Sequence, residues 1–193
     1  IQLAKEASKI PGISGLLVVV PYYNKPNQTG QYLHFKAVAE STTLPIMVYN
    51  VPSRVGTGIL PTTLAKLHAE YPHINAIKEA SGNLMIASEI KRLLPNDDFM
   101  LYSGDDALTL PILSVGGVGV VSVVSHVAGR AMNQMIQSFE SGHNKEAKYL
   151  HHKLAEITKA MFITTNPIPV KYAARKIGLP AGVFSLPMCE PSH

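Results

Sequence analysis

The chain contains five short runs of apolar residues that do not alternate with polar ones. Such runs are typical of strands covered on both faces, as in a parallel sheet. Between them lie segments with the apolar spacing of helices, at the interval of a βα unit. We therefore expect an α/β fold with right-handed crossovers. The expected strands are 15–20, 45–49, 74–78, 99–103 and 118–123, and the expected helices between them are 30–42, 61–70, 83–94 and 106–115.

The last third of the chain has a different pattern. After Gly129 the apolar positions follow helical spacing over 130–140, 144–162 and 170–177. Gly142 is a natural stop between two of these helices. We therefore predict one domain over residues 1–142 and a C-terminal helical domain over residues 143–193. The first residues of the chain also look like part of an amphipathic helix.

Polar groups stand at the end of every expected strand. An open sheet concentrates such groups at one switch point, whereas a (β/α)8 barrel collects them around one rim. The pattern therefore favours a TIM barrel, which needs eight strands and typically about 250 residues. We expect the first three βα units to be absent from this chain and to precede Ile1. The groups are Tyr22-Tyr23-Asn24, Tyr49-Asn50, Lys78-Glu79, Gly104-Asp105-Asp106 and Ser122.

Composition narrows the class of protein. Of 193 residues, 46% are hydrophobic and 16% charged, with a net charge of +4, which suits a soluble globular protein. The charges form no block and no basic run with aromatic residues, so we expect no nucleic-acid partner. The apolar runs are shorter than the roughly 18 residues of a membrane span. With Cys189 as the one cysteine and no signal-peptide pattern, we expect a cytoplasmic protein.

Lys78 ends an apolar strand, and two interpretations are open. In the first, the strand reaches the surface there and the lysine is solvated or paired with Glu79. In the second, burial lowers the pKa of the amine, and the free amine attacks a ketone or aldehyde to form a Schiff base. Tyr49, at the end of the preceding strand, could then relay protons, or could simply be a half-buried aromatic residue bonded to backbone.

Three other segments carry candidate groups. Pro52 is expected to turn the chain into a rim loop, where Arg54 is either a carboxylate ligand or a surface arginine. Tyr22 and Tyr23 lie between turn-forming residues and mark either an interface or ordinary loop packing. Asp106 is expected to cap the following helix rather than to bind a metal. The histidines and acidic residues follow no metal-binding motif, so we expect no metal.

The glycines of 116–119 precede a strand, whereas a dinucleotide fingerprint follows one. We therefore expect no nucleotide site, and interpret Gly119 as allowing close approach of backbone.

Taken together, the motifs closely resemble the dihydrodipicolinate synthase family of pyruvate-dependent class I aldolases, which includes N-acetylneuraminate lyase. The resemblance covers nearly the whole chain. The motifs, in order, are P-Y-Y-N-K-P (21–26), Y-N-V-P-S-R-V-G (49–56), I-K-E-A-S-G-N (77–83), S-G-D-D (103–106), G-V-V-S-V (119–123) and N-P-I-P-V-K (166–171).

The resemblance implies a role for each matching residue. Lys78 forms an imine with pyruvate, Tyr49 relays protons, and Tyr23 joins the relay in the site of a neighbouring subunit. Arg54 holds the carboxylate of the aldehyde substrate. The remaining implied positions are the backbone of Gly104 and Val121, lining the pyruvate pocket, and Tyr22, contacting a lysine inhibitor in enzymes with that control.

The implied reaction joins pyruvate to L-aspartate 4-semialdehyde, giving 4-hydroxy-tetrahydrodipicolinate in lysine and diaminopimelate biosynthesis, with no metal or organic cofactor. The implied assembly is a homotetramer built as a dimer of dimers. Two alternatives remain: a sister aldolase acting on sialic acid or a 2-keto-3-deoxy sugar acid, and a non-catalytic paralogue that keeps the pocket. Arg54 favours the semialdehyde, since sugar-cleaving relatives tend to lack it.

The chain departs from the family in three respects: an early segment is unmatched, the first three βα units are absent, and the usual last helix is missing after Pro191. Members carry a Gly-Thr-Thr-Gly-Glu segment early in the barrel, and nothing in this sequence matches it. Five strands would also leave two exposed sheet edges. We therefore expect the chain to be part of a longer enzyme or one piece of a cleaved one, inactive and poorly soluble by itself.

Overall fold

The computed structural model describes residues 1–191, and its internal contacts divide the chain into two compact units, Ile1–Val120 and Val121–His193. The division falls after Val120, before the domain boundary predicted at Gly142. The reason is that α7 (Ser125–Glu140) packs against α8 (Asn144–Met161), so the helices on both sides of Gly142 belong to one unit. Gly142, with a φ of 78°, does lie in the turn between them.

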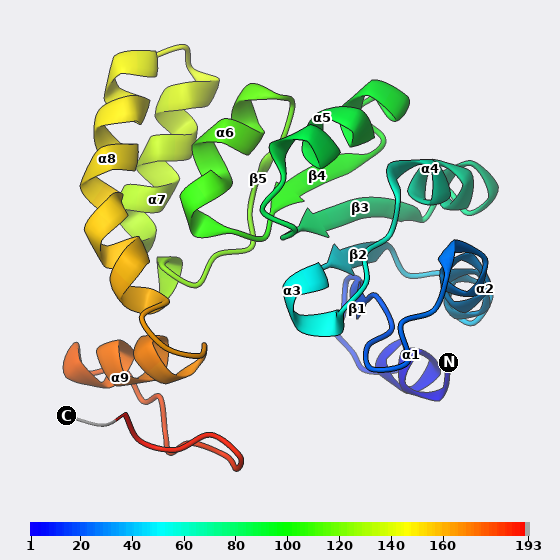
Figure 1. The fold of residues 1–193 in the computed structure, drawn as a ribbon, viewed down its shortest axis with the longest axis horizontal. Helices are drawn as coiled ribbons and strands as arrows, with labels where there is room; N and C mark the ends of the chain where they lie inside the picture. The colour runs from blue at the N-terminus through cyan, green and yellow to red at the C-terminus, as the bar shows by residue number, and fades with distance from the viewer. Residues whose placement is uncertain (192–193) are drawn as a thin grey trace. The chain divides into compact units, whose positions relative to one another are not determined.

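The first unit is built on a parallel sheet with strand order β1-β2-β3-β4-β5 (Figure 1). All five predicted strands are present, although β5 is shorter than the sequence suggested. Because every pair is parallel, the carboxyl ends of the strands lie at the same edge of the sheet. The strands are β1 (Leu16–Val19), β2 (Ile46–Asn50), β3 (Ile74–Glu79), β4 (Met100–Ser103) and β5 (Gly119–Val120).

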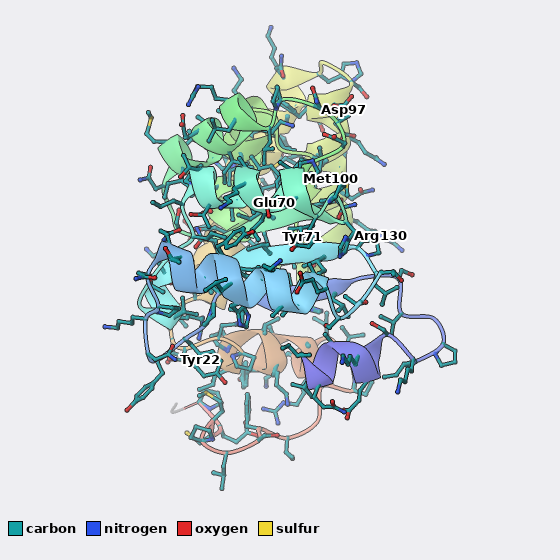
Figure 2. The ribbon with its side chains drawn as sticks, turned by 90° about the vertical axis from the view of Figure 1, so that its right-hand side faces the viewer. Tyr22, Glu70, Tyr71, Asp97, Met100 and Arg130 are labelled. Carbon is teal, nitrogen blue, oxygen red and sulfur yellow. The ribbon has the colours of Figure 1, made fainter. Side chains whose placement is uncertain are left out.

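Helices cover one face of this sheet. Figure 2 looks onto α2 (Gln28–Ala39), α4 (Pro61–Glu70) and α5 (Leu84–Leu93), which lie side by side in front of the strands. A single apolar cluster joins these helices to the sheet, so the burial of apolar surface fixes the helical layer on the strands. Its fully buried large side chains include Phe35, Leu64, Ile90, Ile46 and Ile77.

The other face of the sheet is only partly covered. Along β2 the side chains alternate, with Ile46 and Val48 buried toward the helices and Met47 and Tyr49 half-buried on the opposite side. On β1, Leu17 is 52% exposed. The sequence predicted cover on both faces, and among the described residues the helices of the unit lie on one side of the sheet. The half-buried face is where the candidate site lies.

With one exception, the short helix over Pro52–Val55, the remaining elements match the predicted helical segments. In the first unit they are α1 (Gln2–Ala7), α3 (Pro52–Val55), a 3-10 turn (Asp106–Leu108) and α6 (Thr109–Ser114). The second unit consists of α7, α8 and α9 (Ile168–Lys176), which pack against one another. Among residues 1–191 we find no helix with the length and apolar character needed to cross a membrane.

Candidate active site

The register of the sheet places Tyr49 and Lys78 side by side. Tyr49 on β2 pairs with Lys78 on β3, and both side chains emerge on the half-buried face near the strand ends. The Nζ atom of Lys78 lies 4.2 Å from the centroid of the Tyr49 ring. An ammonium over a phenol ring is attracted by the negative face of the ring. The structure thus brings together the two residues that the sequence singled out first.

Gly104 provides the space for the lysine side chain. A Cβ atom at this position would lie 3.0 Å from Cγ of Lys78 and 2.7 Å from Cβ of Ala80. Contacts this short would force the lysine stem to move. Gly104 was predicted to line a substrate pocket with its backbone, and the structure adds that its lack of a side chain allows Lys78 to lie against the sheet edge.

The surroundings of Lys78 favour the free amine. The pKa of Lys78 is lowered, mainly because burial disfavours the charged ammonium. The negative charge of Asp106 raises this pKa, and the positive charge of Arg54 lowers it. The pKa of Tyr49 is raised by burial and lowered by the charge of Arg54. Arg54 therefore lies close enough to act electrostatically on both groups. A lysine with a depressed pKa supplies more nucleophile at neutral pH.

The alternative in which Lys78 pairs with Glu79 does not describe the structure. Glu79 is 2% exposed and points to the opposite, helix-covered face. Its carboxylate accepts hydrogen bonds from Nδ2 of Asn50 and from the backbone N–H of Ser81. Because successive side chains on a strand point to opposite faces, adjacent residues rarely pair with each other.

Arg54 lies on a short helix, which corrects the prediction of a rim loop. Pro52 occupies the first position of α3, where its missing N–H costs nothing, and Gly56 ends the helix with a φ of 80°. The sequence reasoning used Pro52 only as a strand breaker and overlooked that the same residue starts helices. As a result Arg54 is exposed on an ordered turn that follows the Tyr49 strand.

Tyr22 and Tyr23 do not join this group within the chain. Tyr23 is 92% exposed and has a φ of 68°, which is uncommon for a residue other than glycine. Tyr22 extends into solvent from the loop between β1 and α2 (Figure 2). Two exposed aromatic rings, one on a strained backbone, require an explanation outside the chain itself.

The acidic pair after β4 differs from its prediction. Asp105, not Asp106, provides the cap, since its Oδ1 accepts a hydrogen bond from Ala107 N–H at 2.9 Å. Asp106 begins the 3-10 turn and is buried, and its charge acts on Lys78. The sequence did not assign this electrostatic role, although a second acid at a strand end was a visible signal. Among the described residues, no three His, Cys, Asp or Glu side chains are grouped to hold a metal ion.

The glycine-rich segment gives one correction. A Cβ atom at Gly119 would lie 3.2 Å from Cε1 of Tyr102, so the residue makes room for a tyrosine ring rather than for backbone. Val121 follows β5 directly and opens the second compact unit. Its place in a substrate pocket stays a prediction.

The lowered pKa of Lys78 can be tested without a substrate. Lys36 serves as an internal reference, because its hydrogen bond to Glu40 raises its pKa. Acylation requires the free amine, so the labelling rate of each lysine rises as the pH increases through its own pKa. We expect the half-maximal rate of Lys78 at a lower pH than that of Lys36, measured by competitive labelling and peptide mass spectrometry. The opposite order would contradict the desolvated environment described above.

Comparison with known proteins extends over the whole chain. The model of the dihydrodipicolinate synthetase family matches residues 1–193. The chain is 52% identical over 193 residues to 4-hydroxy-tetrahydrodipicolinate synthase of Desulforudis audaxviator, covering 100% of this chain and 65% of the relative. It is 50% identical over 188 residues to the enzyme of the same name from Desulforamulus reducens, covering 97% of this chain and 63% of the relative.

A solved structure has the same fold. DHDPS from Cyanidioschyzon merolae, crystallised with lysine bound, superposes with a TM-score of 0.95 at 46% identity, covering 99% of this chain and 64% of that one. The chain thus spans less than two thirds of the length of these relatives.

Proposed function

The chain belongs to the dihydrodipicolinate synthetase family, and on that premise we propose that the intact protein is a lyase that condenses pyruvate with L-aspartate 4-semialdehyde. The product is 4-hydroxy-tetrahydrodipicolinate, an intermediate of lysine and diaminopimelate biosynthesis. The observation that carries the proposal is the half-buried amine of Lys78, 4.2 Å from the Tyr49 ring and close to the charge of Arg54. The names of the relatives support the same reaction.

The proposed chemistry begins on Lys78. Its free amine attacks the ketone carbon of pyruvate, and loss of water gives an imine that acts as an electron sink. Loss of a methyl proton produces an enamine, whose carbon attacks the aldehyde of the second substrate. The substrate amine then attacks the imine carbon, which closes the ring and releases Lys78. Each step moves a proton, and the phenol of Tyr49, whose ring lies beside Lys78, is proposed to carry it.

Arg54 is the proposed ligand of the aldehyde substrate. Its guanidinium stands on α3, one turn beyond the end of the Tyr49 strand, and forms bidentate bonds well with a carboxylate. The semialdehyde carries such a carboxylate next to its amine. Gly104 and Val121 are proposed to line the pyruvate side of the pocket with their backbone.

Other parts of the proposal concern the intact protein. We propose that the five strands belong to a (β/α)8 barrel followed by a C-terminal helical domain, and that no metal or organic cofactor takes part. Tyr23, exposed and with a positive φ, would reach the site of a neighbouring subunit in a cytoplasmic homotetramer. Tyr22 would contact a lysine inhibitor in an intact protein that binds one, as the relative from C. merolae binds lysine.

The choice of aldehyde separates this proposal from its nearest rival, a sister aldolase for sialic or 2-keto-3-deoxy sugar acids. We expect the intact protein to turn over the semialdehyde and not N-acetylmannosamine, each assayed with pyruvate. Replacing Arg54 by alanine should raise the KM for the semialdehyde by about 10- to 100-fold, because a bidentate charged contact is lost. The KM for pyruvate should change little.

Two results would count against this assignment. Turnover of N-acetylmannosamine in preference to the semialdehyde would favour the sister aldolase. Binding of pyruvate with no turnover of either aldehyde would favour a non-catalytic paralogue. Arg92→Ala is a suitable control, since that arginine is also exposed but bonds to Glu89 on a distant helix, α5.

A further inference from the structure

A buried pair of polar side chains directly follows the two residues at the centre of the site. Asn50 comes after Tyr49, Glu79 comes after Lys78, and the register pairs Asn50 with Glu79. Their side chains are 1% and 2% exposed and lie on the face opposite to the amine. A buried carboxylate is costly unless its oxygens accept hydrogen bonds. The burial of Glu79 at the end of β3 therefore depends on the partners that hydrogen-bond to its carboxylate.

The hydrogen bonds of the pair form one connected set. Nδ2 of Asn50 donates to Oε2 of Glu79 at 2.7 Å, and the N–H of Ser81 donates to Oε1 of Glu79 at 2.6 Å. Oδ1 of Asn50 accepts from the N–H of Ile59 at 3.2 Å. The first bond joins the ends of β2 and β3, and the third closes the segment between Asn50 and Ile59 that contains α3.

We propose that Asn50 and Glu79 form a clamp that positions Lys78 against Tyr49 and holds the Arg54 segment beside them. The inference rests on the proposed function, because it assigns the two residues a part in the same reaction. Neither side chain touches the reacting atoms, so both are positioning residues. They act by fixing the ends of the two strands from the side opposite to the chemistry.

The backbone alone does not explain this arrangement. Ala80 N–H donates to Asn50 O at 2.8 Å and Gly104 N–H donates to Glu79 O at 2.7 Å, so the sheet ladder already continues past the pair. The bonds of the ladder lie in the plane of the sheet and join backbone alone, so they do not fix the side chains on either face. The side-chain bond adds a fixed point on the second face. A reacting group displaced by about 1 Å can lose on the order of 100-fold in rate.

The chemistry of the pair allows a test by exchange. In Glu79→Gln, the two donors of Asn50 and Ser81 face one oxygen and one NH2 group, so one hydrogen bond is lost. In Asn50→Asp, two carboxylates face each other across the strands. The double variant Asn50→Asp/Glu79→Gln restores every bond, because the new amide at position 79 donates to the new carboxylate at position 50. Ile59 and Ser81 still find an acceptor each.

The experiment measures imine formation with pyruvate in the intact protein, trapped by borohydride and located by peptide mass spectrometry. We expect each single variant to form the imine about 10- to 100-fold more slowly than the wild type, and the double variant to return to within about threefold. The pH at which imine formation reaches half of its maximal rate should change in parallel. In the single variants Lys78 is less fixed in its desolvated position, so we expect this pH to be higher than in the wild type. In the double variant it should return to the wild-type value.

Glu89→Gln is the matched control, since it makes the same chemical change in an exposed ion pair with Arg92. Melting temperatures show which variants are folded at the assay temperature. A double variant that is folded but forms the imine as slowly as the single variants would overturn the clamp. Folded single variants with the wild-type rate and the wild-type pH of half-maximal rate would overturn it as well. A wild-type protein that forms no imine would instead overturn the proposed function, and the clamp with it.

Discussion

We expect replacement of Lys78 by arginine in the intact protein to abolish imine formation and to lower kcat/KM for the condensation on the order of 10⁴-fold or more. Arginine keeps the positive charge and the long stem, but its guanidinium stays protonated and cannot form a Schiff base with a ketone. The variant therefore separates nucleophilic catalysis from simple charge. Measurement of steady-state rates and of borohydride trapping with pyruvate checks the prediction.

The chain offers a closely matched control for this change. Nζ of Lys66 lies 4.3 Å from the centroid of the Tyr32 ring, which is nearly the geometry of Lys78 over Tyr49, but Lys66 is 61% exposed. Lys66→Arg should keep the wild-type rate. Comparable losses in both variants would mean that cation–ring contacts, and not a reactive amine, account for the effect.

The second large effect is expected at Tyr49. Tyr49→Phe keeps the ring beside Lys78 and most of the packing but removes the hydroxyl that carries protons. We expect kcat to fall by about 10²- to 10⁴-fold, the usual contribution of a positioned acid or base. The KM for the semialdehyde should change much less, because Arg54, not the phenol, is the proposed ligand of that substrate.

Tyr102 provides the comparison for Tyr49. It flanks Lys78 on the other side of β3 in the register, and its hydroxyl contacts Sδ of Met100. Tyr102→Phe should leave kcat within a few-fold of the wild type. If the two variants lost activity equally, the assignment of the proton relay to the Tyr49 hydroxyl would be wrong.

The sequence predicted the frame of the site correctly because short apolar runs and polar strand ends are strong local signals. The strand that ends at Lys78 and the strand that ends at Tyr49 were both identified, and parallel pairing then made them neighbours. Belonging to one family was also predictable, since six motifs occur in one order over the chain.

The predictions were wrong where a residue can play two structural roles or where two neighbouring residues can play the same one. Pro52 both ends a strand and begins α3, and either Asp105 or Asp106 was able to cap the next turn. The direction of Glu79 was not visible in the sequence either. A carboxylate next to a lysine suggests an ion pair. Because successive side chains on a strand point to opposite faces, the Glu79 carboxylate instead lies on the other face, where it accepts a hydrogen bond from Asn50.

The face on which a side chain is covered was the hardest feature to predict. Continuous apolar strands indicated burial on both sides; among the described residues the helices of the unit cover one side, and Tyr49 and Lys78 are half-buried on the other. That half-burial lowers the pKa of the amine while leaving it reachable, a balance that depends on three-dimensional packing rather than on local sequence.

The most direct test is to treat the intact protein with borohydride in the presence of pyruvate and to map the modified peptide by mass spectrometry. We predict that the peptide containing Lys78 alone gains the mass of the reduced pyruvate adduct. An unmodified Lys78, or an adduct on another lysine, would contradict the central claim that this amine is the nucleophile.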